Sequence, residues 1–140
     1  MSLNKLKQYQ QAQNQCGIAA ANPHRLIQML MEGALEKMAN AKGFITRNDF
    51  ANKGAQISWA IKIIGGLKES LDYEKGGEIS ENLDKLYDFM IFKLSEANIE
   101  NSVEKIDEAI TIMKNIKEGW DGIEEESKAF FESSVRAEYA

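Results

Sequence analysis

The sequence is poor in the residues that build covalent cross-links, metal centres and catalytic pairs. Its 140 residues include one cysteine, Cys16, and one histidine, His24. One cysteine cannot form an internal disulfide, and di-iron, haem and zinc sites each need more of these ligands than the chain has. We expect His24 to be solvated in the first turn of a helix, where it would not serve a nucleophile as base. The sequence therefore predicts a protein without metal or cofactor that is not an enzyme.

Proline, long apolar runs and excess positive charge are also missing. Pro23 is the only proline, so long stretches contain no helix breaker. No segment has the ~20 consecutive apolar residues of a membrane-spanning helix, and residues 1–15 contain no apolar signal core. The net charge of −5 argues against nucleic acid as a partner. We expect a soluble protein in a reducing compartment, the cytoplasm, with no insertion into membranes.

The sequence does have helical periodicity in its apolar residues, over four consecutive stretches. The expected helices cover approximately residues 23–46, 49–72, 77–98 and 101–123 or beyond. The first starts at Asn22-Pro23, an N-cap residue followed by proline at the first helical position. Asn101, with Glu104 three residues later, is the expected cap of the fourth helix.

Short polar connections join these stretches and predict how they pack. The fold class is all-α: an antiparallel up-down four-helix bundle over residues 22–123. Residues 1–21 are predicted to form a short helical arm, and residues 124–140 an acidic tail that frays. The residues expected to face inward include Phe50, Ile79, Leu86 and Ile123.

Two glycine pairs mark the middle of the chain. Gly76-Gly77 falls where a helix should stop, and glycine there adopts positive φ without strain. Gly65-Gly66 falls inside a helical pattern, where each glycine costs about 1 kcal/mol relative to alanine. The second pair therefore indicates either a kink or the close approach of another backbone.

Some large apolar residues lie outside the predicted inward stripes. Trp59 and Ile63 lie nearly opposite the inward stripe of the second helix, on the same side as Gly66. A tryptophan, an isoleucine and a missing side chain would form a shallow groove, and an amphipathic helix is the natural occupant of such a groove. The alternative interpretation, that these residues are the edge of the core, is equally open.

Several segments resemble the flagellar secretion chaperones that bind flagellin, the FliS family. The resembling segments are Asn22–Leu30 with Glu32–Leu35, Ile63–Leu67, Ser70–Asp72, Glu74–Ile79, Asn82–Leu83, Leu86–Met90 and Leu94–Asn98, with Ile116, Trp120 and Ile123 of the last helix. The resemblance runs from about Tyr9 to Ile123. Met31 departs from it, because the family usually has tyrosine there, and Trp59 and Phe92 stand where polar or basic residues are expected.

The resemblance implies an export chaperone that binds the disordered C-terminal segment of new flagellin in the cytoplasm. Binding would prevent premature polymerisation and keep flagellin competent for flagellar type III secretion. The resemblance also allows a co-chaperone or a component of the export gate as a further partner. The expected flagellin groove comprises Met31, Leu35, Trp59, Ile63, Gly66, Leu67, Tyr87 and Ile91.

Two further expectations concern the arm and self-association. The arm, through Leu6 and Tyr9, is expected to lie over a bundle groove and compete with the partner. The alternative to a chaperone is a self-associating structural or adaptor bundle, in which Trp59, Ile63 and Phe92 bury one another in a homodimer.

Overall fold

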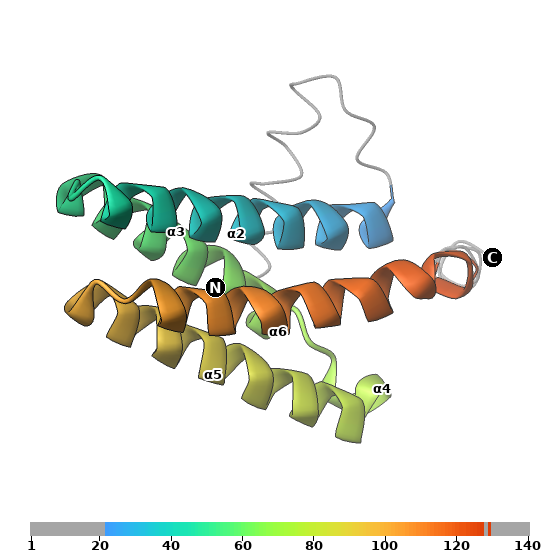
Figure 1. Ribbon diagram of the computed structural model, residues 1–140. Coiled ribbons are helices and arrows are strands. Elements are labelled where there is room, and N and C mark those ends of the chain that lie inside the picture. Colours follow the sequence, from blue (N-terminus) through green and yellow to red (C-terminus); the bar gives the residue numbers. More distant parts are fainter. Residues whose placement is uncertain (1–21, 128, 130–140) are drawn as a thin grey trace.

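Four long helices form an antiparallel bundle in the computed structural model, which describes residues 22–127 and 129 (Figure 1). The helices are α2 (Pro23–Thr46), α3 (Phe50–Glu69), α5 (Glu78–Glu100) and α6 (Val103–Gly122), with a single turn, α4 (Tyr73–Gly76), before α5. α2 packs against α3 and α6, and α5 packs against the same two helices. The helices therefore form a four-sided ring in the order α2, α3, α5, α6. The predicted all-α bundle is confirmed.

Polar side chains cap the starts of three of the four long helices, α2, α3 and α6. The Asn22 side chain accepts a hydrogen bond from the backbone N–H of His24 at 3.0 Å, so α2 begins as Asn22-Pro23 predicts. The predicted cap of the last helix is wrong. Asn101 ends α5 in the left-handed conformation, with φ of 53°, which asparagine tolerates. Ser102 is then the cap of α6 and accepts from the backbone N–H of Lys105 at 3.2 Å.

The connection between α3 and α5 is more structured than a simple corner. α3 ends at Glu69, and the Asp72 side chain accepts hydrogen bonds from the backbone N–H groups of Glu74 and Lys75 to start α4. Gly77 then turns the chain into α5 with φ of 51° and ψ of −124°. The predicted positive φ at this glycine pair is confirmed at Gly77.

The core runs the length of the bundle and is built from aliphatic residues and methionines. The large side chains with the least exposure are Met38, Ile57, Ile64, Leu67, Met90, Leu94, Ile106 and Met113. Four residues predicted to face inward are exposed instead, namely Phe50, Ile79, Leu86 and Ile123. Three of them stand at a helix end, where neighbouring helices give little cover, and Tyr87 rather than Leu86 enters the core. No helix of the described part is both long and apolar enough to cross a bilayer.

His24 joins the first long helix to the last. The prediction that it is solvated is wrong, because its side chain is fully buried. Its ring stacks on Trp120 with centroids 4.4 Å apart and planes 8° apart. Trp120 also donates its indole N–H to the His24 carbonyl oxygen at 3.0 Å. The start of α2 is therefore held against the end of α6.

Candidate partner-binding grooves

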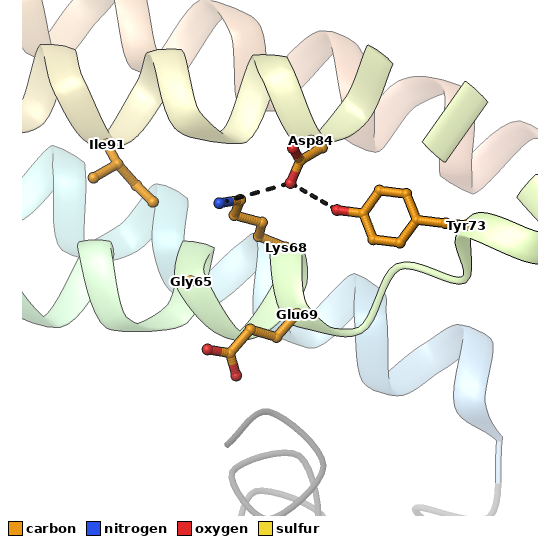
Figure 2. Close-up of a pocket in the computed structure, with 6 residues that line it drawn as sticks. All are labelled: Gly65, Lys68, Glu69, Tyr73, Asp84 and Ile91. Carbon is orange, nitrogen blue, oxygen red and sulfur yellow. Dashed lines mark hydrogen bonds and ion pairs between the residues drawn. The ribbon is translucent and has the colours of Figure 1, made fainter. Parts of the chain in front are cut away.

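One hollow lies between α3 and α5 and is called here the α3/α5 groove. Its volume is about 590 Å³, and its lining residues are Gly65, Lys68, Glu69, Tyr73, Asp84 and Ile91 (Figure 2). Figure 2 shows Lys68 and Tyr73 both directed at Asp84, whereas Glu69 points away from it. Gly65 and Ile91 lie on the other side of Lys68. The groove thus has a polar end next to α4 and a less polar end further along the bundle.

Hydrogen bonds and ion pairs organise the polar end. Tyr73 donates its hydroxyl to Asp84 Oδ1 at 2.8 Å, and this bond raises the pKa of Tyr73. Lys68 Nζ lies 2.9 Å from Asp88 Oδ1 and 3.7 Å from Asp84 Oδ1. The hydrogen bond with Asp88 is the main cause that raises the pKa of Lys68. This end therefore presents charged groups that already have partners within the protein.

The other end has open space above a helix backbone. Apart from the neighbouring residues of α3 itself, no heavy atom of the described residues lies within 4 Å of a Cβ built at Gly65 or at Gly66. The expectation that the pair lets a neighbouring helix of the bundle approach is therefore wrong. α3 continues as one helix through both glycines, from Phe50 to Glu69. The missing side chain at Gly65 leaves room in the groove wall, beside the half-buried Ile91.

A second hollow lies between α2 and α6 and is called here the α2/α6 groove. Its volume is about 640 Å³, and its lining residues are Glu32, Leu35, Glu36, Ala39, Lys42, Asp107, Ile110, Thr111 and Lys114. The pairs α2/α6 and α3/α5 form opposite sides of the four-helix ring (Figure 1). The two grooves therefore face away from each other. The molecule thus has two separate hollows on its surface.

The residues of the expected flagellin groove do not lie together. Four of them are buried in the core, namely Met31, Ile63, Leu67 and Tyr87. Leu35 and Ile91 are half-buried and line different grooves. Gly66 is buried on α3, and Trp59 lines neither groove.

The grouping of Trp59 with Ile63 in one surface groove is therefore wrong. Ile63 is 4% exposed and belongs to the core, whereas Trp59 is 51% exposed with Lys37 Nζ 4.7 Å from its ring centroid. α3 packs against both α2 and α5, so a wider arc of its surface is buried than a single stripe predicts. Leu6 and Tyr9 of the arm lie outside the described residues.

Sequence reasoning missed the polar residues of both grooves. Lys68 and Asp84 flank the α3–α5 connection, and Tyr73 lies within it. The opposite charges of Lys68 and Asp84 on either side of a tight turn were a signal in the sequence that the two residues meet. Glu32, Leu35, Glu36 and Ala39 follow the helical spacing i, i+3, i+4, i+7. A mixed stripe of this kind indicates a helix face that is half apolar and half charged.

Within residues 22–127 and 129, no group of three His, Cys, Asp or Glu side chains is placed to hold a metal ion. The two grooves have a similar shape and a similar mixture of side chains. Both lie between neighbouring helices, and both combine aliphatic side chains with lysine and carboxylate groups.

Comparison with known proteins agrees with this architecture. The model of the family "Flagellar protein FliS" matches residues 5–127. The flagellar secretion chaperone FliSB of Pseudomonas aeruginosa is 48% identical over 122 residues, which cover 87% of this chain and 97% of that protein. The flagellar secretion chaperone FliS of Salmonella typhimurium is 42% identical over 130 residues, covering 92% and 95%. Relatives with these names are chaperones, a class without enzymatic activity. The chain therefore belongs to the FliS family of flagellar proteins.

Proposed function

We propose that the protein is a cytoplasmic export chaperone for flagellin. It binds the disordered C-terminal segment of newly made flagellin, prevents premature polymerisation and keeps the subunit competent for flagellar type III secretion. The support comes from its relatives, which are named flagellar secretion chaperones and align with most of this chain. The open helix backbone in the α3/α5 groove is the structural observation that carries the proposal.

The α3/α5 groove suits one amphipathic helix of the client. A helix can approach α3 closely at Gly65, where a Cβ would otherwise stand, and can place an apolar residue against Ile91. Its polar residues can then lie near Lys68 and Asp84 at the α4 end. A segment that folds on binding loses conformational entropy, and contacts of this kind offset that loss. The segment therefore needs apolar surface for affinity and polar contacts that fix its position along the groove.

Calorimetry with a synthetic flagellin C-terminal segment tests the function. We expect a complex of one chaperone with one segment, and circular dichroism should show a gain of helix when the two are mixed. A folded sample of this protein that binds no segment would contradict the proposal.

Two leucine variants test the location. Gly65→Leu fills the open space in the α3/α5 groove, so we expect the affinity for the segment to fall roughly ten-fold or more. Gly119→Leu is the matched control, because a Cβ at Gly119 on α6 also meets no described atom within 4 Å. Equal affinities for the two variants would exclude the α3/α5 groove while leaving the chaperone function open.

The self-associating bundle stays a second candidate with weaker support. Trp59 and Phe92 are 51% and 58% exposed, so both are available to a second copy. Ile63, the third residue of the expected dimer surface, is in the core and cannot contribute. Light scattering at tens of micromolar distinguishes the candidates, since a monomer that binds flagellin excludes an obligate homodimer.

A further inference from the structure

The α2/α6 groove has an apolar centre and two oppositely charged walls. Leu35 and Ile110 are half-buried and join Ala39 as its aliphatic lining. Glu36 stands on the α2 wall and Lys114 on the α6 wall, and both are exposed. At the centre of the groove, the negative charge of Glu36 thus stands on α2 and the positive charge of Lys114 on α6, with the aliphatic lining between them.

Cross-helix ion pairs close the groove at both ends but not in the middle. Lys42 Nζ lies 2.5 Å from Asp107 Oδ1 at one end, and Lys117 Nζ lies 3.8 Å from Glu32 Oε1 at the other. Between these pairs, neither Glu36 nor Lys114 forms an ion pair with any residue that the structure describes. Two exposed charges of opposite sign therefore line one hollow without neutralising each other.

We propose that the α2/α6 groove is a docking site for an amphipathic helix of a second protein, bound at the same time as the client. The helix carries an apolar stripe for Leu35, Ala39 and Ile110. One of its edges is cationic and faces Glu36, and the opposite edge is anionic and faces Lys114. The stretch from Glu32 to Lys42 extends ~15 Å at 1.5 Å per residue, which accommodates about three turns of such a helix.

Position and charge together favour a second protein over the other occupants. The α3/α5 groove, where the client helix is proposed to bind, lies on the opposite side of the ring, so both sites can be filled at once. Residues 1–21 of this chain include Lys5 and Lys7 but no Asp or Glu, so they have no carboxylate that could pair with Lys114. A partner helix with a cationic edge and an anionic edge can pair with both Glu36 and Lys114.

The two charged walls also determine the direction of the bound helix. Reversing a helix in a groove exchanges its two edges, so a helix with one cationic and one anionic edge meets opposite charges in only one direction. In the other direction it meets like charges on both sides, which is unfavourable. Exchanging the charges of Glu36 and Lys114 should therefore reverse the helix without removing its binding site.

The test uses a synthetic 14-residue helix as probe and the full chain labelled for NMR. The probe carries an apolar stripe, lysines on one edge, glutamates on the other and a nitroxide at its N-terminus. We expect chemical shift changes at Leu35, Ala39 and Ile110, and paramagnetic broadening at one end of the groove. In the doubly exchanged variant E36K/K114E, the broadening should move to the other end with affinity within about three-fold of the original.

Matched variants and competition complete the test. Glu36→Lys alone makes both walls cationic and should weaken the probe several-fold, whereas the exchange E81K/K85E on α5, outside both grooves, should change neither affinity nor direction. The flagellin C-terminal segment should leave the probe bound. Displacement by that segment assigns the groove to the client and overturns the proposal. The proposal is equally overturned if a folded sample binds no probe, if direction is unchanged in E36K/K114E, or if a homodimer covers this face; none of these outcomes affects the binding of flagellin itself.

Discussion

At the scale of single residues, a buried lysine joins two helix ends. Lys53 is 6% exposed although lysine is seldom buried without partners. Its Nζ donates hydrogen bonds to the Asn98 carbonyl oxygen at 2.8 Å and to Asn101 Oδ1 at 2.7 Å. Because Asn101 is the left-handed residue that ends α5, Lys53 holds the end of α5 against the start of α3.

Replacing this lysine should destabilise the bundle. Lys53→Met keeps most of the aliphatic stem but removes the donor, so we expect the free energy of unfolding to fall by about 1–3 kcal/mol. Lys62→Met on the same helix is the control, since Lys62 is exposed. Urea denaturation measures both variants, and equal changes would contradict a structural role for Lys53.

Tyr87 makes stability depend on pH in the alkaline range. Burial raises the pKa of Tyr87 from 10.0 to about 12, because the charged phenolate is disfavoured in the core. The folded state thus holds the proton more tightly than the unfolded state does. The resulting stability is fully present below pH 10 and is lost as the pH rises through about 12.

Tyr87→Phe should remove this part of the pH dependence. Between pH ~9 and ~11.5, wild type should lose about 2 kcal/mol more unfolding free energy than the variant. Tyr73→Phe is the comparison variant. The pKa of Tyr73 is raised mainly by its hydrogen bond with Asp84, and its side chain is 49% exposed, so this variant should retain most of the loss that wild type shows. Urea denaturation at the two pH values provides the measurement, and parallel losses in wild type and Tyr87→Phe would refute the interpretation.

At the scale of the elements, glycines have different roles at different positions. Gly77 turns the chain from α4 into α5 with φ of 51°, a value that L side chains rarely adopt. Gly65 instead lies in the interior of α3 with open space where a Cβ would be. The first glycine is required by the connection, whereas the second is required by nothing in the described fold.

Alanine substitutions at these two glycines should change the free energy of unfolding in opposite directions. Gly77→Ala should lower the free energy of unfolding by about 1–2 kcal/mol, because alanine is strained at positive φ. Gly65→Ala should raise it by up to about 1 kcal/mol, because alanine favours the helix and meets no neighbour. Thermal or urea denaturation of both variants gives the comparison. A loss of stability in Gly65→Ala would show that the glycine serves the fold and weaken its assignment to a partner.

At the scale of the whole molecule, contacts between α2 and α6 close the ring of helices. The stack of His24 on Trp120 is joined by a hydrogen bond from Gln28 Nε2 to Asp121 Oδ1 at 2.7 Å. Lys117 Nζ lies 2.7 Å from Asp121 Oδ2, and this bond is the largest cause that lowers the pKa of Asp121. The first and last long helices are thus held together by residues nearly a hundred positions apart in sequence.

The two tryptophans should differ in their importance for this closure. Trp120→Ala removes the stack and the indole hydrogen bond, so we expect it to cost about 2–4 kcal/mol of unfolding free energy. Trp59→Ala should cost less than about 1 kcal/mol, because Trp59 is 51% exposed and Lys37 Nζ lies over its ring at the surface. Chemical denaturation followed by far-ultraviolet circular dichroism avoids the loss of fluorescence signal. A larger effect at Trp59 would contradict this description of the bundle.

The candidate sites could be predicted only in part. Leu35 and Ile91 were expected in a groove and do line hollows, because both are apolar residues at the edge of a helical stripe. They line different hollows, since the order of helices around the ring decides which faces meet. Lys68 and Asp84 were missed, because their importance arises from a contact across the α3–α5 connection.

The helices could be predicted from the sequence because interactions within short segments determine them. Apolar spacing, the Asn22-Pro23 cap and the scarcity of proline are properties of short segments, and they predicted four long helices in an antiparallel bundle. The positive φ at Gly77 could be predicted for the same reason, because the short connection in which it lies determines that angle. Burial of Ile63 and His24 was decided by the tertiary structure, because it depends on which helices stand on either side. Among the described residues, the tertiary structure also decided the open space at Gly65 and the unpaired charges of Glu36 and Lys114 in the α2/α6 groove, because neighbouring helices define both.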